Sequence, residues 1–254
     1  MKTRRALRQA LLHAALLLFL AVNVVPVLWM LSSAVKPQTE LFSTEISFLP
    51  KAPTLSHFLT SIRDYGFLTW VQNSAVITLC TSLLRVAVSF LAAFALSYYR
   101  TRYNAIVFYA IIATMVVPFQ VTMIPNYILI SRMRLVDTWW SVVLPNIAHA
   151  STFFFLRQHI RGIPRAYYEV SMIEGARSFW AFRHVVFGLC KGAVSAMLIL
   201  AVIDSWNLYF WPLLVLRTEA SRTVTIGLKQ FIDHEMGSRW GPFMATATLA
   251  SVPV

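Results

Sequence analysis

Two opposite charges, Arg85 and Asp204, lie inside long apolar stretches and are the side chains best placed to act chemically. Ionised groups are costly inside a membrane and are usually paired or placed on a cavity. We expect both residues to face the interior of a helical bundle, where they pair with each other or with a second subunit. The alternative is that the Arg85 guanidinium meets only backbone carbonyls or extends to the membrane surface.

A polar stretch, RAYYEVSMIEGARSFWAF at 165–182, is the second feature with chemical character. Apolar residues recur at helical spacing on both sides of Gly175, at Ala166, Val170 and Ile173 before it and at Phe179, Phe182 and Val186 after it. Gly175 can adopt a positive φ and so end the first helix. The pattern predicts a helix–glycine–helix elbow, suited either to docking into a soluble partner or to lying on lipid headgroups.

The sequence holds no pattern typical of catalysis or metal binding. Six histidines are scattered without an HExxH spacing, and the two cysteines, Cys80 and Cys190, have no metal-ligand spacing. A glycine-rich phosphate loop is also absent from the sequence. We therefore expect no metal site, no bound cofactor and no enzymatic activity in this chain.

The composition indicates the environment in which these residues lie. The chain is 58% hydrophobic and only 13% charged, with a mean hydropathy of +0.64, whereas about a quarter of the residues in a soluble domain are charged. Together with the long apolar runs that repeat along the whole length, these values predict an all-α polytopic membrane protein. The net charge of +12 fits Lys and Arg that flank membrane spans, and no basic stripe with interleaved aromatic residues indicates nucleic-acid binding.

Six membrane spans are predicted, within one transmembrane domain over 11–254, at about 11–31, 70–97, 105–125, 139–156, 192–214 and 241–254. The first could be taken for a signal peptide, but it is longer than the usual apolar region of about 7 to 15 residues. The last would rise only about 21 Å, against a hydrocarbon core of about 30 Å, so we expect it to be truncated. Pro118 and Pro125 are expected to kink the third span.

Basic residues predict that the N-terminus, 1–10, is cytoplasmic. The segments that would then lie inside, 1–10, 98–104 and 157–191, hold twelve Lys and Arg in 52 residues. The segments that would lie outside, 32–69, 126–138 and 215–240, hold nine in 77 residues. The higher density inside follows the positive-inside rule, so the polar elbow belongs to a cytoplasmic loop, 157–191.

This loop resembles a known motif. EVSMIEGA (169–176), followed by FRHVVFGLCKGA (182–193), is similar to the EAA loop of ATP-binding cassette (ABC) importer permeases. Glu169, Gly175 and Ala176 match that motif, and Glu174 stands where Asp is usual. The chain departs from it where Val170 and Ser171 replace alanines and where Gly188 and Gly192 replace prolines.

The resemblance extends beyond the loop. WNLYFWPLL (206–214) is similar to a signature in the fifth span of carbohydrate-importer permeases of the maltose type, and VVPFQVTMIPNY (116–127) also fits that group. STFFFLRQ (151–158) and the basic residue in span two resemble glycerol-3-phosphate permeases. The chain thus resembles the smaller permease subunit of these importers over nearly its whole length.

The resemblance implies a six-helix type I ABC importer fold in a bacterial or archaeal cytoplasmic membrane. It implies a sister permease that completes a heterodimer, two ATP-binding subunits that carry ATP-Mg, and an extracytoplasmic solute-binding protein. The elbow would couple this chain to an ATPase subunit. The coupling residues implied are Glu169, Val170, Ile173, Glu174, Gly175, Ala176 and Phe179.

The implied function is import of a carbohydrate, either a sugar or an oligosaccharide. The alternative solute is sn-glycerol-3-phosphate or a related phosphorylated polyol, because an anion would suit the buried Arg85. The candidate residues of the translocation pathway are Arg85, Gln120, Asn126, Asn146, Asp204, Asn207 and Tyr209. A second alternative, a secondary transporter or a non-transporting membrane subunit, would be indicated if no ATPase accompanied this chain.

Overall fold

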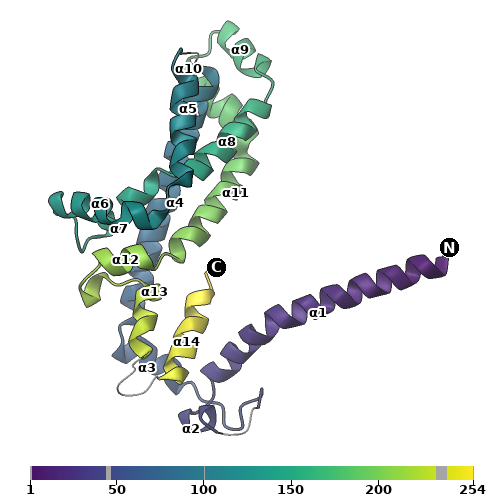
Figure 1. Cartoon of the computed structure of the whole chain (residues 1–254), viewed down its shortest axis with the longest axis vertical. Helices are drawn as coiled ribbons and strands as arrows, with labels where there is room; N and C mark the ends of the chain where they lie inside the picture. The colour runs from purple at the N-terminus through teal and green to yellow at the C-terminus, as the bar shows by residue number, and fades with distance from the viewer. Residues whose placement is uncertain (1, 44–46, 100, 233–238, 254) are drawn as a thin grey trace. The chain divides into compact units, whose positions relative to one another are not determined.

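The computed structural model describes residues 2–43, 47–99, 101–232 and 239–253, and every regular element in those ranges is a helix (Figure 1). The predicted all-α class is therefore confirmed. Three helical segments in the described ranges are long and apolar enough to cross a membrane, at Arg8–Ala34, Phe67–Tyr98 and Ser178–Trp206. A fourth is counted if a sharply bent pair of helices forms one span.

The chain divides into two compact units, of which the first comprises 1–68 and 226–254. Its helices are α1 (Lys2–Ala34), α2 (Gln38–Leu41), α3 (Ser56–Asp64), η4 (Leu228–Phe231) and α14 (Trp240–Ser251). The predicted first span lies within α1, and the predicted last span corresponds to α14, with residue 254 outside the described ranges.

Helix α14 packs against α1 and α3, and a glycine permits the contact with α3. A Cβ atom at Gly241 would lie 2.4 Å from two atoms of the His57 ring. That ring is buried and bonds through Nε2 to the Lys36 carbonyl oxygen at 2.8 Å. Nearby, the Thr246 hydroxyl donates to Ser61 Oγ at 2.8 Å, so polar as well as steric contacts fix the two helices together.

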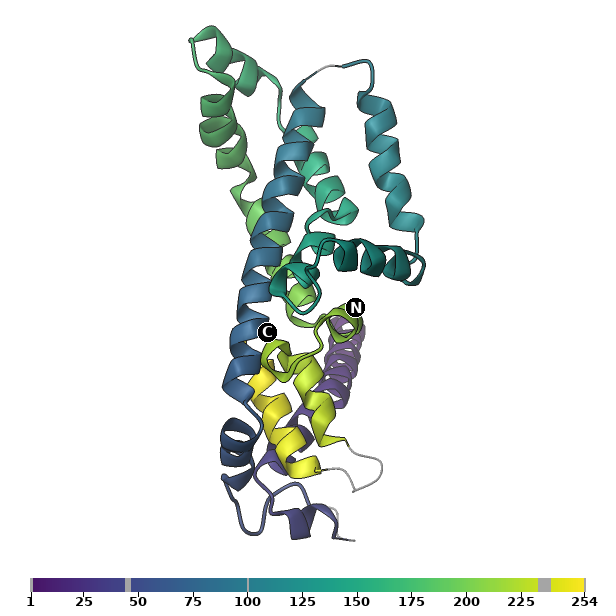
Figure 2. The ribbon, with the colours of Figure 1, turned by 90° about the vertical axis from the view of Figure 1, so that its left-hand side faces the viewer.

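The second unit, 69–225, contains the elbow and both intramembrane charges. Its long helix α4 (Phe67–Tyr98) is seen along its length in Figure 2. Apolar side chains of α4, α8 (Ala150–Gly162) and α11 (Phe187–Trp206) meet in one core, where Phe90, Leu156 and Cys190 are among the buried residues. The elbow is attached to this core, because Tyr168 of the elbow is one of the buried residues.

The second unit also contains shorter elements. They are α5 (Asn104–Ala113), η1 (Thr114–Val116), α6 (Phe119–Arg132), α7 (Trp139–Ile147), α9 (Ala166–Ile173), α10 (Ser178–Ala181), the π-helical η2 (Phe182–Val186), α12 (Phe210–Val215) and η3 (Glu219–Ser221). One more, α13 (Val224–Gly227), begins at its edge.

Proline breaks the predicted third span. The run 105–125 was expected to be one kinked helix, but α5 with η1 is separated from α6 by a bend of 104°. Val117, just before Pro118, has the extended conformation that a following proline favours. Pro125 lies inside α6 without ending it, so of the two expected kinks the break is at Pro118.

Two other predicted spans are also divided. The run 139–156 contains α7 and the start of α8, separated by Ala148 and His149, which are both extended. The run 192–214 contains most of α11 and then α12, with 207–209 between them. The apolar runs were located from the sequence, but the single helices expected in these two are pairs, and the total of six spans stays a prediction.

Candidate functional site

The elbow is built as the sequence predicted, with α9 ending at a glycine of positive φ. Gly175 has φ +87°. The Gly175 N–H donates to the Met172 carbonyl at 3.1 Å, and the Ala176 N–H donates to the Ser171 carbonyl at 3.0 Å. This pair of bonds is a Schellman motif, which satisfies the last carbonyls of a helix and reverses the chain. Figure 1 shows α9 and α10 on either side of that reversal.

One side of α9 is fastened to the end of α4. The Tyr168 ring lies 4.3 Å from the Tyr98 ring, measured between centroids. Arg165 Nη2 donates to the Tyr98 carbonyl at 3.1 Å, while Arg165 Nε pairs with Glu169 Oε1 at 2.9 Å. Glu169 therefore helps to orient the arginine that attaches α9 to α4.

The other side of the elbow is apolar and uncovered. Val170, Ile173 and Phe179 are 51%, 85% and 70% exposed, respectively. Glu174 is exposed beside them, and Ala176 is half-buried. Clustered exposed apolar side chains with polar neighbours are typical of a surface that binds another protein or a membrane.

The second apolar stripe of the elbow does not stay on one face. Phe179 is exposed, but Val186 is fully buried and the Phe182 ring lies 4.9 Å from that of Phe94. The π-helical turn η2 contains Phe182 and Val186 and joins α10 to α11. A π turn holds one more residue than an α turn, so it changes the direction in which successive side chains point.

A hollow lies at the turn of the elbow. It measures about 400 Å³ and is lined by Ser171, Glu174, Gly175, Ala176, Arg177 and Trp180. Its acidic and basic side chains belong to the same short turn. The elbow thus presents exposed apolar side chains and also a recess that contains Glu174 and Arg177.

Arg85 and Asp204, paired as one alternative foresaw, form the second candidate site. Arg85 is only 3% exposed in its side chain, and its Nη1 lies 3.5 Å from Asp204 Oδ2. Its Nε donates to the carbonyl oxygen of Asn146 at 3.0 Å. Arg85 therefore joins α4 to α11 and to the last turn of α7.

The other predicted pathway residues are not joined to this pair. Gln120 is exposed and Asn126 half-buried on α6. Asn207 caps α11 and donates to its own helix at the Ile203 carbonyl, 2.8 Å away, while Tyr209 precedes α12. Within the described ranges, no hydrogen bond links these four residues to Arg85 or Asp204.

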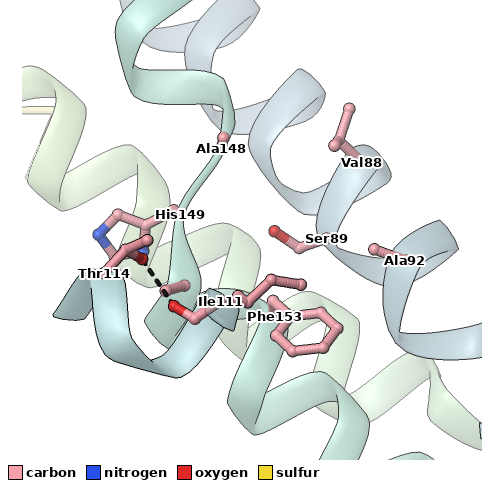
Figure 3. Close-up of a pocket in the computed structure, with 9 residues that line it drawn as sticks. Val88, Ser89, Ala92, Ile111, Thr114, Ala148, His149 and Phe153 are labelled. Carbon is pink, nitrogen blue, oxygen red and sulfur yellow. Dashed lines mark hydrogen bonds between the residues drawn. The ribbon is translucent and has the colours of Figure 1, made fainter. Parts of the chain in front are cut away.

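A cavity that sequence reasoning missed lies where α4, α5 and α8 meet. It measures about 270 Å³, and its lining is mostly apolar with His149, Thr114 and Ser89 as polar members. In Figure 3, His149 and Thr114 lie on one side of it and the α4 residues Val88, Ser89 and Ala92 on the other. His149 is oriented by a 3.0 Å hydrogen bond to Thr152 Oγ1. A lone histidine in an apolar run gave no signal of this arrangement.

A second unforeseen feature is the polar turn around Asp137. Asp137 Oδ1 accepts hydrogen bonds from the backbone N–H groups of Arg217 and Thr218 and from Ser221 Oγ, at 2.8, 3.1 and 2.5 Å. Burial alone would raise the pKa of this carboxyl group, but the hydrogen bonds outweigh it and lower the pKa to about 2. Asp137 is therefore ionised at neutral pH and connects two loops through these hydrogen bonds.

Comparison with known proteins identifies the class of chain to which this geometry belongs. Residues 85–254 match the family described as the binding-protein-dependent transport system inner membrane component. The arabinooligosaccharides transport system permease protein AraQ of Bacillus subtilis is 30% identical over 233 residues, which cover 90% of this chain and 82% of AraQ. The sn-glycerol-3-phosphate transport system permease protein UgpE of Brucella suis is 28% identical over 251 residues, which cover 95% and 88%.

A solved structure has the same fold. It is described as a bacterial ABC transporter involved in the import of the acidic polysaccharide alginate. The match has a TM-score of 0.86 and covers 96% of this chain and 91% of that one. At 21% sequence identity the likeness concerns the fold alone.

Proposed function

Because the chain belongs to the family of binding-protein-dependent transport system inner membrane components, we propose that it forms half of the translocation pathway of an ATP-driven carbohydrate importer. Membership implies a multi-pass membrane protein that works with an ATPase and a solute-binding protein. In the proposed assembly, this chain pairs with a sister permease as a heterodimer. Two ATP-binding subunits hold ATP-Mg, and the N-terminus is cytoplasmic.

The elbow is the observation that carries this proposal. Val170, Ile173 and Phe179 are exposed on a segment whose other side is fastened to α4 through Tyr168 and Arg165. A surface built only to pack within this chain would have these apolar residues covered. The arrangement fits a coupling element whose free side docks into an ATPase subunit.

The attachments of the elbow suggest how closure of the ATPase reaches the pathway. A push on α9 would pass to α4 through the Tyr168–Tyr98 contact and the Arg165 hydrogen bond. The same push would pass to α11 through α10 and η2, whose Phe182 packs on α4. Because α4 and α11 also hold Arg85 and Asp204, a rocking movement of the elbow would reach both charges.

The solute is proposed to be a carbohydrate. The named relatives support two classes, since AraQ is an arabinooligosaccharide permease and UgpE an sn-glycerol-3-phosphate permease at similar identity. The phosphate alternative would be favoured by a free guanidinium, but Arg85 is buried and contacts both Asp204 and the Asn146 carbonyl. A carbohydrate, which needs hydrogen-bonding groups and no counter-charge, therefore fits the described residues better.

Purification of the tagged chain from its native membrane in mild detergent, followed by mass spectrometry, tests the assembly. We expect the unchanged chain to retain an ATPase and a second permease. Gly175→Arg should lose the ATPase, because any side chain there is strained at φ +87° and disturbs the turn. Gly162→Arg is the matched control, because that glycine is exposed, has open space and needs no positive φ.

A second variant separates docking from folding. Ile173→Glu should leave the thermal unfolding midpoint unchanged, because this side chain is 85% exposed. It should nevertheless lose the ATPase, because the exposed apolar side of the elbow would carry a charge. Recovery of neither partner with the unchanged chain would contradict the importer proposal and favour the secondary-transporter or non-transporting alternative.

A further inference from the structure

Asp204 is an exposed carboxylate inside an apolar helix. Its side chain is 59% exposed, whereas that of its partner Arg85 is 3% exposed. It lies two residues before the end of α11, next to the non-helical stretch 207–209. Ionised groups and irregular backbone at membrane depth are tolerated where they line water or are covered by protein, and not where they face lipid.

The contact with Arg85 positions this carboxylate but leaves it able to accept further hydrogen bonds. The distance of 3.5 Å from Asp204 Oδ2 to Arg85 Nη1 exceeds the usual 2.7–2.9 Å of a charge-assisted hydrogen bond. Arg85 Nε in turn donates a hydrogen bond to the Asn146 carbonyl oxygen, which fixes the guanidinium. Asp204 thus keeps acceptor capacity on the side that faces away from this chain.

We propose, on the premise of the function proposed above, that Asp204 faces the solute and accepts its hydroxyl groups, and that this carboxylate selects uncharged polyhydroxyl solutes over anionic ones. Arg85 is its positioning residue. A solute that approaches from the exposed side meets the carboxylate before the guanidinium. A hydroxyl group can donate to that carboxylate, whereas a phosphate or carboxylate group carries negative charge and is repelled by it.

Asn207 is a suitable reporter of the field near Asp204. It is exposed one helical turn further along, and its side-chain amide donates to the Ile203 carbonyl of its own helix. Asn207→Cys, in a chain that also carries Cys80→Ala and Cys190→Ala, would be treated with a cationic and an anionic methanethiosulfonate reagent. The whole complex in membrane vesicles is used, and retention of the ATPase and sister permease confirms assembly.

We expect Asn207→Cys to react, and the cationic reagent to react several-fold faster than the anionic one. Adding Asp204→Asn should shift the ratio of the two rates by about tenfold toward the anionic reagent, because charged clefts change local ion concentrations on this scale and Arg85 is then unpaired. Ile199→Cys is the control. Ile199 is an exposed apolar residue of α11, and we expect a cysteine in this apolar surrounding not to react.

The solute preference is tested by protection of the same cysteine. Arabinotriose should slow the reaction in the chain with Asp204, and sn-glycerol-3-phosphate should not. Asp204→Asn should allow both to protect. Equal protection by the two probes with Asp204 present, or protection by neither, would overturn the selection.

Failure of this inference is distinguishable from failure of the proposed function. An assembled complex in which Asn207→Cys does not react, or in which Asp204→Asn leaves the rate ratio unchanged, would show that Asp204 is covered by the sister permease. The inference would then be wrong while the importer assembly stood. Loss of both partners from the unchanged chain would instead contradict the function itself.

Discussion

A single carboxylate, Asp137, ties together two loops that are far apart in the sequence. Asp137 has a positive φ of 65°, which is uncommon for a residue other than glycine. The strain is held by the three hydrogen bonds to Oδ1 and by the bond from its own N–H to the Val215 carbonyl at 2.8 Å. Close by, Trp139 Nε1 donates to Asn73 Oδ1 at 3.0 Å, so the start of α7 is fixed to α4.

The pKa of Asp137 gives a prediction about acid stability. Its folded-state pKa of about 2 lies below the ordinary value of 3.8, so the ionised form is favoured by folding. The resulting stabilisation is present above about pH 4 and is lost as the pH falls towards 2. We expect Asp137→Asn to lower the thermal unfolding midpoint in detergent at pH 6, with the two proteins converging near pH 2.

Glu219→Gln is the control for that measurement. The Glu219 side chain is 84% exposed and only pairs with Arg222 within its own turn. Its removal should leave the unfolding midpoint nearly unchanged across the same pH range, because exposed ion pairs contribute little. A constant difference between the unchanged protein and Asp137→Asn down to pH 2 would show that the charge of Asp137 is not what stabilises the turn.

Residues differ in how far the sequence reveals them. Gly175 was predictable because its signal is local: an apolar stripe precedes it, and only glycine readily takes the φ that ends the helix. Arg85 and Asp204 were predictable because charge in an apolar run demands a partner. Asp137 was not, because its partners lie some 80 positions further along the chain and nothing in its own neighbourhood identifies them.

At the scale of elements, the boundaries of α5, α7 and α11 show what hydropathy misses. Apolar residues continue across the breaks after each of these helices, so an average over the window finds one long run. Pro118 marked the first break, since proline disfavours helix in the residue before it. The breaks at Ala148–His149 and at 207–209 have no proline in them. At the second break, the Thr225 hydroxyl donates to the Leu208 carbonyl at 2.7 Å, a contact that the local sequence does not reveal.

Packing between α3 and α14 gives a second prediction. Gly241→Ala places a Cβ atom 2.4 Å from the buried His57 ring, which is itself bonded to the Lys36 carbonyl. The ring cannot move without losing that bond, so we expect a loss of about 1 to 3 kcal/mol in the free energy of unfolding, as for other overpacked cores. The unfolding midpoint in detergent measures it.

Two further variants identify the cause of any loss at Gly241. Gly188→Ala is the control, because Gly188 lies in α11 with open space around its Cβ position and should be unaffected or slightly stabilised. His57→Ala should remove most of the added cost of Gly241→Ala, since the clash disappears with the ring. If the double variant is as unstable as the sum of the two single ones, the steric explanation is wrong.

The whole molecule consists of two units that carry different roles. Residues 69–225 contain the core, the elbow and both intramembrane charges, whereas 1–68 and 226–254 contain the long helix α1 and the α3–α14 contact. Only three helical segments in the described ranges pass as spans by length and composition, or four with the bent pair. Divided helices of this kind are expected where a membrane protein lines a polar path, because irregular backbone there can contact water.

The orientation of the whole chain gives the last prediction. If the N-terminus is cytoplasmic, the exposed Phe179 of the elbow faces the cytoplasm and the exposed Ala220 of η3 faces outward. Single cysteines at these positions, in a chain that carries Cys80→Ala and Cys190→Ala, would be treated with a membrane-impermeant maleimide on intact cells and on inside-out vesicles.

Ala220→Cys should react only on intact cells and Phe179→Cys only on inside-out vesicles. The physical reason is that twelve Lys and Arg in 52 residues would lie inside, against nine in 77 outside, and basic loops are retained in the cytoplasm. The reverse pattern would place the elbow outside. An ATPase in the cytoplasm could not then reach Ile173 or Phe179, so this one measurement bears on the topology and on the coupling role together.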